Sequence, residues 1–510
     1  MIWKNRILRA YGTSLLGVFS GLVTNLWLLR EITHHVSTTD FGVYAFVLQI
    51  SSYLLVLQLG LDFAASRQIA ESLGKGDTEA ANRAYWELWR VNHISVALVA
   101  LCVVGLTIAF WSGIALSHDA PIRLAATVAL LAGTAQTIGF CSRPYSAALI
   151  GSQRLPAVNV VVALRTVVTS VVAYCILLRG LGVLSVPVAE IMTQLAALLV
   201  FARICHLHYH WRTARSTMRD RQLLRSILKF GGITTLGGLA WTIEGTSDVV
   251  ILGWFAGPAA VATYVLWWRF PQMLFDLSTR LAFSAFPGFA ERHGQSAEAS
   301  RSLFGKVSVL TMGMATMTLI GVSVWLPSFI YNWVGSKFSV PNPRLLAFEM
   351  GLLVCLRTWG NLLGMFWMAT GRSALTTFTS WSQATLKLIL ALLLVKHYGL
   401  IGVVASSCLS AVLQITVVGS LLLKERFLSL SQSLRDLVFV LVAILLALSA
   451  SQLSINVHLA YLVVGIAATV ALWASVWFTF ASRTELGPAL VPAVGNLMRR
   501  LRLPWLVPGR

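Results

Sequence analysis

The feature that most constrains this chain is a series of apolar runs, each long enough to cross a lipid bilayer as a helix. A helix of about 20 residues spans the hydrocarbon layer, whereas a membrane β-barrel shows strands of about ten residues with alternating polarity. The runs here have helical length, and 57% of the 510 residues are hydrophobic while only 11% are charged. We therefore expect an all-α polytopic membrane protein.

Polar breaks between the apolar windows predict fourteen transmembrane helices. Their expected bounds are 11–33, 41–64, 91–117, 122–142, 155–178, 182–203, 229–254, 258–286, 305–327, 346–370, 373–395, 399–423, 436–454 and 458–481. The segment 1–9 has a positive net charge, and no small-residue cleavage site follows the first apolar run. We expect that run to be retained rather than removed as a signal peptide.

The formal net charge of +20 is distributed over many short loops, so no nucleic-acid partner is expected. With the N-terminus inside, 28 Lys or Arg residues fall in inner segments and six in outer segments. The positive-inside rule then predicts a multi-pass membrane protein with an even number of spans and both termini in the cytoplasm. The basic stretch from His206 to Arg225 is interpreted as a connector that touches anionic membrane lipids, with a nucleotide or partner site as the alternative.

Several function classes lack their sequence signals. The six cysteines lie in or beside apolar runs without CxxC spacing, which predicts neither a disulfide framework nor a metal site. No P-loop pattern is present, which argues against an ATP-driven pump. The longest outer loop, 328–345, contains no acid or His, so no catalytic residue and no enzyme is predicted.

A pattern of short segments returns at an offset of about 220 residues. The matched pairs are ILRAYG with ILKFG, GVYAF with ATYVL, AESLGKGDTEA with AERHGQSAEA, LIGSQ with ATGRS, and RGLGVLSV with HYGLIGVV. We expect two pseudosymmetric six-helix lobes that bind substrate between them and open alternately to each side of the membrane. The predicted domains are an N-lobe at 1–205, a basic linker at 206–228, a C-lobe at 229–423, two further helices at 424–481 and a basic tail at 482–510.

Charged residues inside the predicted spans are the candidate site, because each would cost about 2.5–3.5 kcal/mol if it faced lipid. The cations expected to bind an anionic substrate are Arg165, Arg269, Arg280, Arg357 and Lys387. The acids expected to act in ion pairs or ion coupling are Asp62, Glu190, Glu244, Asp248 and Asp276.

Spacing gives more specific expectations for these charges. Asp276 and Arg280 lie four residues apart, which favours an ion pair on one helix face. Glu244 and Arg269 fall at similar depth in a predicted helical hairpin, so we expect them to approach each other. Glu190 follows Pro187 and is either a proton-carrying acid or, as we favour, a packing residue. Tryptophans in the charged spans are candidates for stacking on sugar rings: Trp241, Trp267, Trp268, Trp359, Trp367 and Trp381.

The fourteen-helix pattern, the duplication, the TTDFGVYAF segment (38–46) and the LGLDFAASRQIA stretch (59–70) resemble one transporter family. It is the polysaccharide or O-antigen (Wzx-type) flippase family of the multidrug/oligosaccharidyl-lipid/polysaccharide (MOP) exporter superfamily. The resemblance implies a MATE-like fold and alternating-access transport of an undecaprenyl-diphosphate-linked oligosaccharide across the bacterial inner membrane through a cationic cavity. It also implies polysaccharide-assembly proteins as partners and no cofactor, with H⁺ or Na⁺ coupling left open.

Three alternatives remain at this point. A lipid II flippase has the same fold and closely related substrate chemistry. A cation-coupled multidrug antiporter would have lobes dominated by acids, whereas five basic residues here balance five acidic ones within the spans. A membrane glycan polymerase, ligase or glycosyltransferase is the alternative from the enzyme class.

Overall fold

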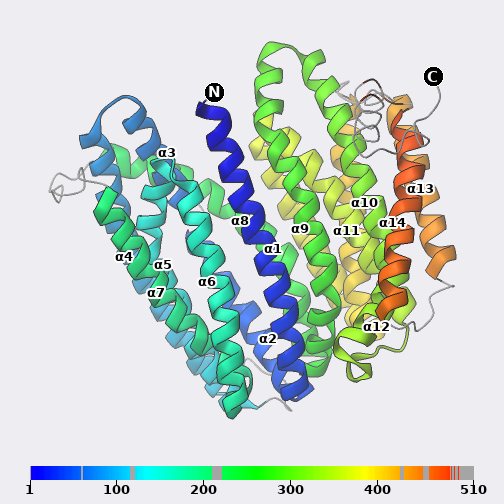
Figure 1. Ribbon diagram of the computed structural model, residues 1–510, viewed down its shortest axis with the longest axis horizontal. Helices are drawn as coiled ribbons and strands as arrows, with labels where there is room; N and C mark the ends of the chain where they lie inside the picture. Colours follow the sequence, from blue (N-terminus) through cyan, green and yellow to red (C-terminus); the bar gives the residue numbers. More distant parts are fainter. Residues whose placement is uncertain are drawn as a thin grey trace. The chain divides into compact units, whose positions relative to one another are not determined.

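The structure is a computed structural model that describes residues 2–58, 61–114, 121–208, 221–424, 430–451 and 459–482, with residues 484, 488 and 492. Within these ranges the chain is almost entirely helical and has no β-strand (Figure 1). The predicted all-α membrane fold is therefore confirmed. Eight helical segments of the described part are long and apolar enough to cross a membrane. The exact number of fourteen spans stays a prediction.

Contacts along the chain divide it into two compact units, Met1–Ala262 and Thr263–Arg510. This division falls inside one long helix, α9 (Gly257–Gln295), rather than in the predicted linker at 206–228, of which residues 209–220 lie outside the described ranges. The domain bounds inferred from the sequence therefore stay a prediction.

Unit 1 contains eight α-helices and three short helical segments in its described part. Their bounds are α1 (Ile2–His35), α2 (Thr38–Ser52), η1 (Tyr53–Gln58), α3 (Leu61–Gly74), α4 (Thr78–Trp111), α5 (Ile122–Gly151), α6 (Leu155–Ile176), η2 (Leu177–Leu181), η3 (Gly182–Leu184), α7 (Ser185–His208) and α8 (Arg221–Phe255). Helix α5 lies at the centre, in contact with α2, α3, α4, α6 and α7, while α1 packs on α6.

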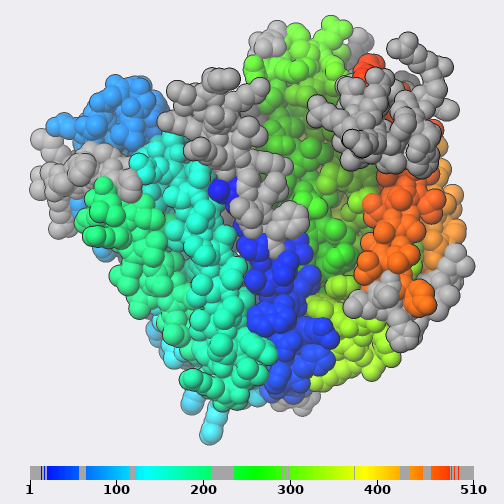
Figure 2. Space-filling model, viewed as in Figure 1, coloured from blue at the N-terminus to red at the C-terminus, as the bar shows by residue number. Residues whose placement is uncertain are grey.

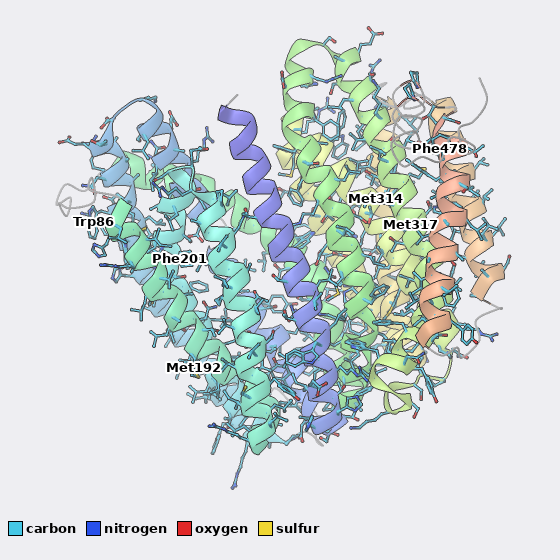
Figure 3. The ribbon with its side chains drawn as sticks, viewed as in Figure 1. Trp86, Met192, Phe201, Met314, Met317 and Phe478 are labelled. Carbon is cyan, nitrogen blue, oxygen red and sulfur yellow. The ribbon has the colours of Figure 1, made fainter. Side chains whose placement is uncertain are left out.

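Side-chain size explains why α5 is central. Its buried face is rich in Ala and Gly, and a side chain at Gly133 would overlap Val103 of α4. Small residues let helices approach closely where lipid provides no hydrophobic drive for association. The neighbouring α4 presents a stripe of exposed aliphatic side chains for lipid: Ile94, Leu98, Leu101 and Ile108. Toward the helix ends, Phe201 of α7 belongs to a buried cluster against which Trp86 of α4 packs, whereas Met192 of α7 is exposed (Figure 3).

Unit 2 contains most of α9 and five further α-helices in its described part. Their bounds are α10 (Ala297–Val334), η5 (Ser336–Phe338), α11 (Pro343–Ala369), α12 (Ser373–Lys424), α13 (Leu430–Ser451) and α14 (Leu459–Ser482). Helix α11 packs between α10 and α12, and α13 and α14 pack on α10.

Tryptophans attach α14 to α10. The indole nitrogens of Trp473 and Trp477 donate to the α10 carbonyls of Gly313 (3.3 Å) and Val309 (3.1 Å). In the opposite direction, Trp325 of α10 donates to Thr469 of α14 at 3.0 Å. Figure 2 shows α14, in orange, at the surface of unit 2, and Figure 3 shows Met314 and Met317 on the stretch of α10 beside it.

Helix breaks occur at corresponding places in the two halves of the sequence. Between α6 and α7 the backbone departs from the helix at Gly180 (φ 87°, ψ 11°) and Gly182 (φ 55°, ψ −136°), and α12 departs from it at Gly399 (φ 55°, ψ −127°). These glycines lie in the matched segments RGLGVLSV and HYGLIGVV. The φ values are positive, a region that glycine enters without steric cost.

Capping interactions also recur. The Asp77 side chain accepts from the Ala80 amide at the start of α4, and the Ser296 side chain accepts from the Ala299 amide at the start of α10. Both caps belong to the matched loop segments and lie 219 residues apart.

The same turn ends α5 and α11. Arg154 N donates to Leu149 O at 2.8 Å, and Arg372 N donates to Trp367 O at 3.0 Å. These turns align at an offset of 218 residues, so the sequence match of LIGSQ with ATGRS is wrong by two positions. Each turn needs one residue with positive φ, which is Gln153 (63°) in the first and Gly371 (86°) in the second.

The turns after α5 and α11 predict that alanine substitution at their positive-φ residues changes stability unequally. We expect Gly371→Ala to destabilise the protein by about 1 kcal/mol, because a Cβ is disfavoured at positive φ. The control is Gln153→Ala, which already has a Cβ in the same conformation and should be close to neutral. Thermal unfolding of purified protein in detergent measures both, and equal losses would contradict the assignment.

The α10–α14 interface makes a second prediction. A Cβ at Gly313 would overlap the Trp477 indole, so we expect Gly313→Ala to lower stability by about 1–3 kcal/mol through overpacking. Gly321→Ala, on the same helix with open space around its Cβ position, is the matched control. If the two variants unfold at the same temperature, the close approach of α14 at Gly313 is wrong.

Candidate functional site

The predicted site residues of unit 2 lie on α9, α11 and α12. Arg357 of α11 is 8% exposed, and its guanidinium carbon lies 5.3 Å from the ring centroid of Trp268 on α9. A guanidinium over an indole face is a cation–π contact. This contact orients a cation that the sequence predicted to lie inside a span and to bind an anionic substrate.

Tryptophans beside this contact have different roles. The Trp267 indole donates to the Phe338 carbonyl at 3.0 Å and is 2% exposed, and Trp367 is 1% exposed. These two rings fill the protein interior and present no free face to a sugar. Trp268 holds Arg357, while Trp241 of α8 is 58% exposed. The sugar-stacking prediction therefore fails for Trp267 and Trp367.

Helix α9 also contains Arg269, Asp276 and Arg280. The Asp276 carboxylate accepts a hydrogen bond of 3.0 Å from Gln272, one turn earlier, and forms no ion pair with Arg280, although both residues are described. The expected Asp276–Arg280 contact is thus absent between these two described residues, although Arg280 and Arg269 attract the carboxylate electrostatically. Asp276 and Arg280 are both exposed, whereas Arg269 is half-buried.

Lys387 lies in the first half of α12 and has no exposed surface. Its ammonium group is embedded in the protein rather than directed into lipid, as the cost of a charge in hydrocarbon requires. Whether Lys387 and the other cations bind an anion stays a prediction.

The predicted site residues of unit 1 lie on α3, α6, α7 and α8, and Arg143 lies on α5. Arg143 of α5 donates to Asp62 of α3 at 3.3 Å. Arg165 of α6 and Glu190 of α7 attract each other electrostatically, and the positive charge of Arg143 repels Arg165. Four charged groups from four helices therefore lie in one region of unit 1.

Helices α6 and α7 are joined beside these charges. The hydroxyls of Thr169 and Thr193 lie 2.7 Å apart, and they follow Arg165 and Glu190 by four and three residues on their helices. Gln194 of α7 lies against Gly139 of α5, where a Cβ would come within 3.2 Å of its amide nitrogen. The polar face of α7 is thus packed on both α5 and α6.

Helix α8 contributes Glu244 and Asp248, which are 7% and 0% exposed. Between them on the same helix, the Thr246 side chain forms a hydrogen bond with the phenol of Tyr53 in η1. The charge of Asp248 also acts on this phenol. Glu244 belongs to unit 1 and Arg269 to unit 2, so their expected approach stays a prediction.

Two charged residues within the helices were not among those predicted from the sequence. Arg143 was assigned to an inner segment because it follows the predicted end of a span, yet α5 continues to Gly151. Glu349 of α11 was not included among the acids within the spans, and its buried Oε2 has no hydrogen-bond partner among the described residues. No group of three or more His, Cys, Asp or Glu residues suited to a metal ion occurs in the part that the structure describes.

Comparison with known proteins supplies the family. A family model described as "Polysaccharide biosynthesis protein" matches residues 14–293, which is more than half of the chain. No curated protein sequence matches the chain.

Solved structures supply the fold. The lipid II flippase MurJ in an inward closed conformation superposes with a TM-score of 0.69 at 10% identity, over 94% of this chain and 99% of that chain. An inward-facing multidrug resistance MATE family transporter of the MOP superfamily gives 0.63 at 15% identity, over 81% and 98%. A MOP superfamily transporter from Pyrococcus furiosus gives 0.58 at 16% identity, over 83% and 96%. The chain therefore has the fold of MOP transporters.

The Arg357–Trp268 contact predicts a measurable coupling. We expect Arg357→Met and Trp268→Leu each to destabilise unit 2, and the double variant to lose less than the sum by about 0.5–2 kcal/mol. Thermal unfolding of the wild type and three variants completes the cycle. Strictly additive losses would show that the two side chains do not interact.

Proposed function

Because the chain belongs to the polysaccharide biosynthesis protein family, we propose that it is a flippase for lipid-linked oligosaccharides. Its substrate is an undecaprenyl-diphosphate-linked glycan unit that crosses the bacterial inner membrane from the cytoplasmic to the outer leaflet. The glycan serves O-antigen, capsule or exopolysaccharide synthesis. Both termini lie in the cytoplasm, and the protein performs no covalent chemistry on the glycan.

The observation that carries this proposal is the set of cations within membrane helices of a protein with this family match. Arg165 lies on α6, Arg357 on α11 and Lys387 on α12. Ionisable residues at membrane depth are costly and therefore mark substrate pathways. Arginine suits a diphosphate because its planar fork donates two parallel hydrogen bonds, and lysine adds a point charge.

Alternating access supplies the movement. The recurring caps and glycine breaks support two related six-helix lobes, 1–205 and 229–423, that move against each other about the substrate. Arg269 and Arg280 complete the cationic set in this proposal. The acids Asp62, Glu190, Glu244, Asp248 and Asp276 hold ion pairs or couple transport to an H⁺ or Na⁺ gradient.

A lipid II flippase is the second candidate, favoured by the structural match that covers 94% of this chain. Lipid II also joins a glycan to a polyprenyl diphosphate, so the cations would serve it equally. A multidrug antiporter is less well supported, because the MATE match covers 81% of this chain.

Deletion of the gene tests function and substrate together. We expect lipid-linked oligosaccharide to accumulate on the cytoplasmic leaflet, because the unit is made there and can no longer cross. Mass spectrometry of the lipid extract identifies the glycan. Accumulation of lipid II instead would establish the second candidate, and an unchanged lipid-linked glycan pool would contradict both.

Complementation of that deletion tests the cations. Arg269→Ala, Arg357→Ala and Lys387→Ala should each lower export by about tenfold or more, since a lost charged hydrogen bond is worth roughly 1.5–3 kcal/mol. Lys396→Ala removes an exposed lysine from the same helix as Lys387 and serves as the control. Membrane levels of each variant are measured in parallel. Full export by all three variants would remove the phosphate role of these residues.

A further inference from the structure

Two arginines of unit 1 have hydrogen-bonding capacity that the protein leaves unused. The Arg143 side chain is 45% exposed, and its one hydrogen bond to a described residue is the 3.3 Å contact with Asp62. A guanidinium carries five N–H donors. Most of the donors of Arg143 therefore remain available to an incoming acceptor.

Asp62 is under-satisfied in the same contact. Its side chain is 16% exposed, Oδ2 accepts from Arg143, and the buried Oδ1 has no hydrogen-bond partner among the described residues. A carboxylate held by a single long hydrogen bond is a weak partner for an arginine, which elsewhere favours bidentate contacts of about 2.7–2.9 Å. The pair balances charge without satisfying either group.

Arg165 brings a second positive charge to this place. Its side chain forms no hydrogen bond and no ion pair with any other residue in the described ranges, although it is only partly exposed. Glu190 attracts it electrostatically without ion-pair contact, and Arg143 repels it. Two like charges in a region of low dielectric constant destabilise each other unless an anion lies near both.

The surrounding helices hold this arrangement in place. The Thr169–Thr193 contact and the close approach of Gln194 to Gly139 fix α6, α7 and α5 beside the four charges. Gln136, seven residues before Arg143 on α5, has a buried side-chain oxygen without a hydrogen-bond partner among the described residues. Two cations with unused donors therefore lie between packed helices of unit 1.

We propose that Arg143 and Arg165 form an anion subsite within unit 1 for a phosphate or diphosphate ester. In the empty subsite Asp62 is the counter-ion of Arg143, and Arg143 releases Asp62 when the anion binds. This inference rests on the proposed function, because the diphosphate of the lipid-linked substrate is the anion that it assigns. Glu190 is the corresponding counter-charge for Arg165. Exchange of one anion for another keeps both arginines neutralised throughout.

The test is binding of inorganic pyrophosphate to the full-length protein in nanodiscs of phosphatidylcholine, followed by titration calorimetry. Arg143→Gln should weaken binding by about tenfold, since it removes a charged donor pair. Asp62→Asn should strengthen binding several-fold, because the competing carboxylate is gone while the side-chain shape is kept. The double variant should bind as weakly as Arg143→Gln alone, since Asp62 acts only through Arg143.

Matched controls lie on the same helix as Asp62. Glu71 and Lys75 form an exposed ion pair of 2.8 Å at the end of α3, and the hydrogen bond from Lys75 lowers the pKa of the Glu71 carboxyl. Glu71→Gln and Lys75→Gln make the same changes of charge and should leave pyrophosphate binding unchanged. Thermal unfolding of every variant separates loss of binding from loss of folding.

Asp62→Asn gives the decisive result. Weaker binding in a folded Asp62→Asn protein would overturn the counter-ion role, because Asp62 would then be needed to position Arg143. Wild-type binding by Arg143→Gln would overturn the subsite itself.

Two further experiments distinguish the lipid-linked substrate from a membrane lipid as the source of the phosphate. Competition by a short-chain polyprenyl diphosphate supports the substrate, whereas loss of pyrophosphate binding in nanodiscs containing phosphatidylglycerol assigns the subsite to a membrane lipid and overturns the substrate assignment. The deletion experiment is independent of this result. A subsite that behaves as expected in a protein whose deletion leaves lipid-linked glycans unchanged would refute the proposed function and not the subsite.

Discussion

The absence of water from the hydrocarbon layer is the constraint on which this structure depends. Each backbone amide and carbonyl must find its partner within the chain, so the described segments are helices and depart from helical geometry at glycines such as Gly182 and Gly399. Small hydroxyl side chains obey the same rule. The Thr316 hydroxyl, for example, donates to the Met312 carbonyl one turn earlier at 2.7 Å. Close packing through Ala and Gly then supplies the contact energy between helices that hydrophobic burial cannot supply in lipid.

Against that background, charged side chains within the helices are the most informative residues. Several of them are withdrawn from the surface: Lys387 and Asp248 are fully buried, and Arg357 lies over an indole face. In unit 1 the same problem is solved by placing carboxylates near arginines, without complete satisfaction of either partner. A protein that needed these charges only for packing would gain from fully bonded pairs or from apolar replacements. The incomplete solution fits a transporter of an anionic lipid.

Features encoded locally could be predicted from the sequence, and features decided by neighbouring helices could not. The length of the apolar runs correctly predicted a helical membrane fold. The matched loop segments contain helix caps that recur in both halves of the sequence. The carboxylate of Asp276 has Gln272 four residues before it and Arg280 four residues after it, so spacing alone could not choose between them. Arg143 was taken for a loop residue because the end of α5 is polar. The burial of Trp267 and Trp367 depends on tertiary contacts that no periodicity reveals.

The attachment of α14 has a consequence for how this sequence can diverge. Trp473 and Trp477 bond to main-chain carbonyls of α10, which every residue type possesses. Mutations in α10 can therefore accumulate without loss of those two anchors, provided that position 313 remains free of a side chain. Homologues should retain the indoles of the terminal helix and a glycine opposite them while the rest of that surface drifts, which makes the pair a marker for aligning distant relatives.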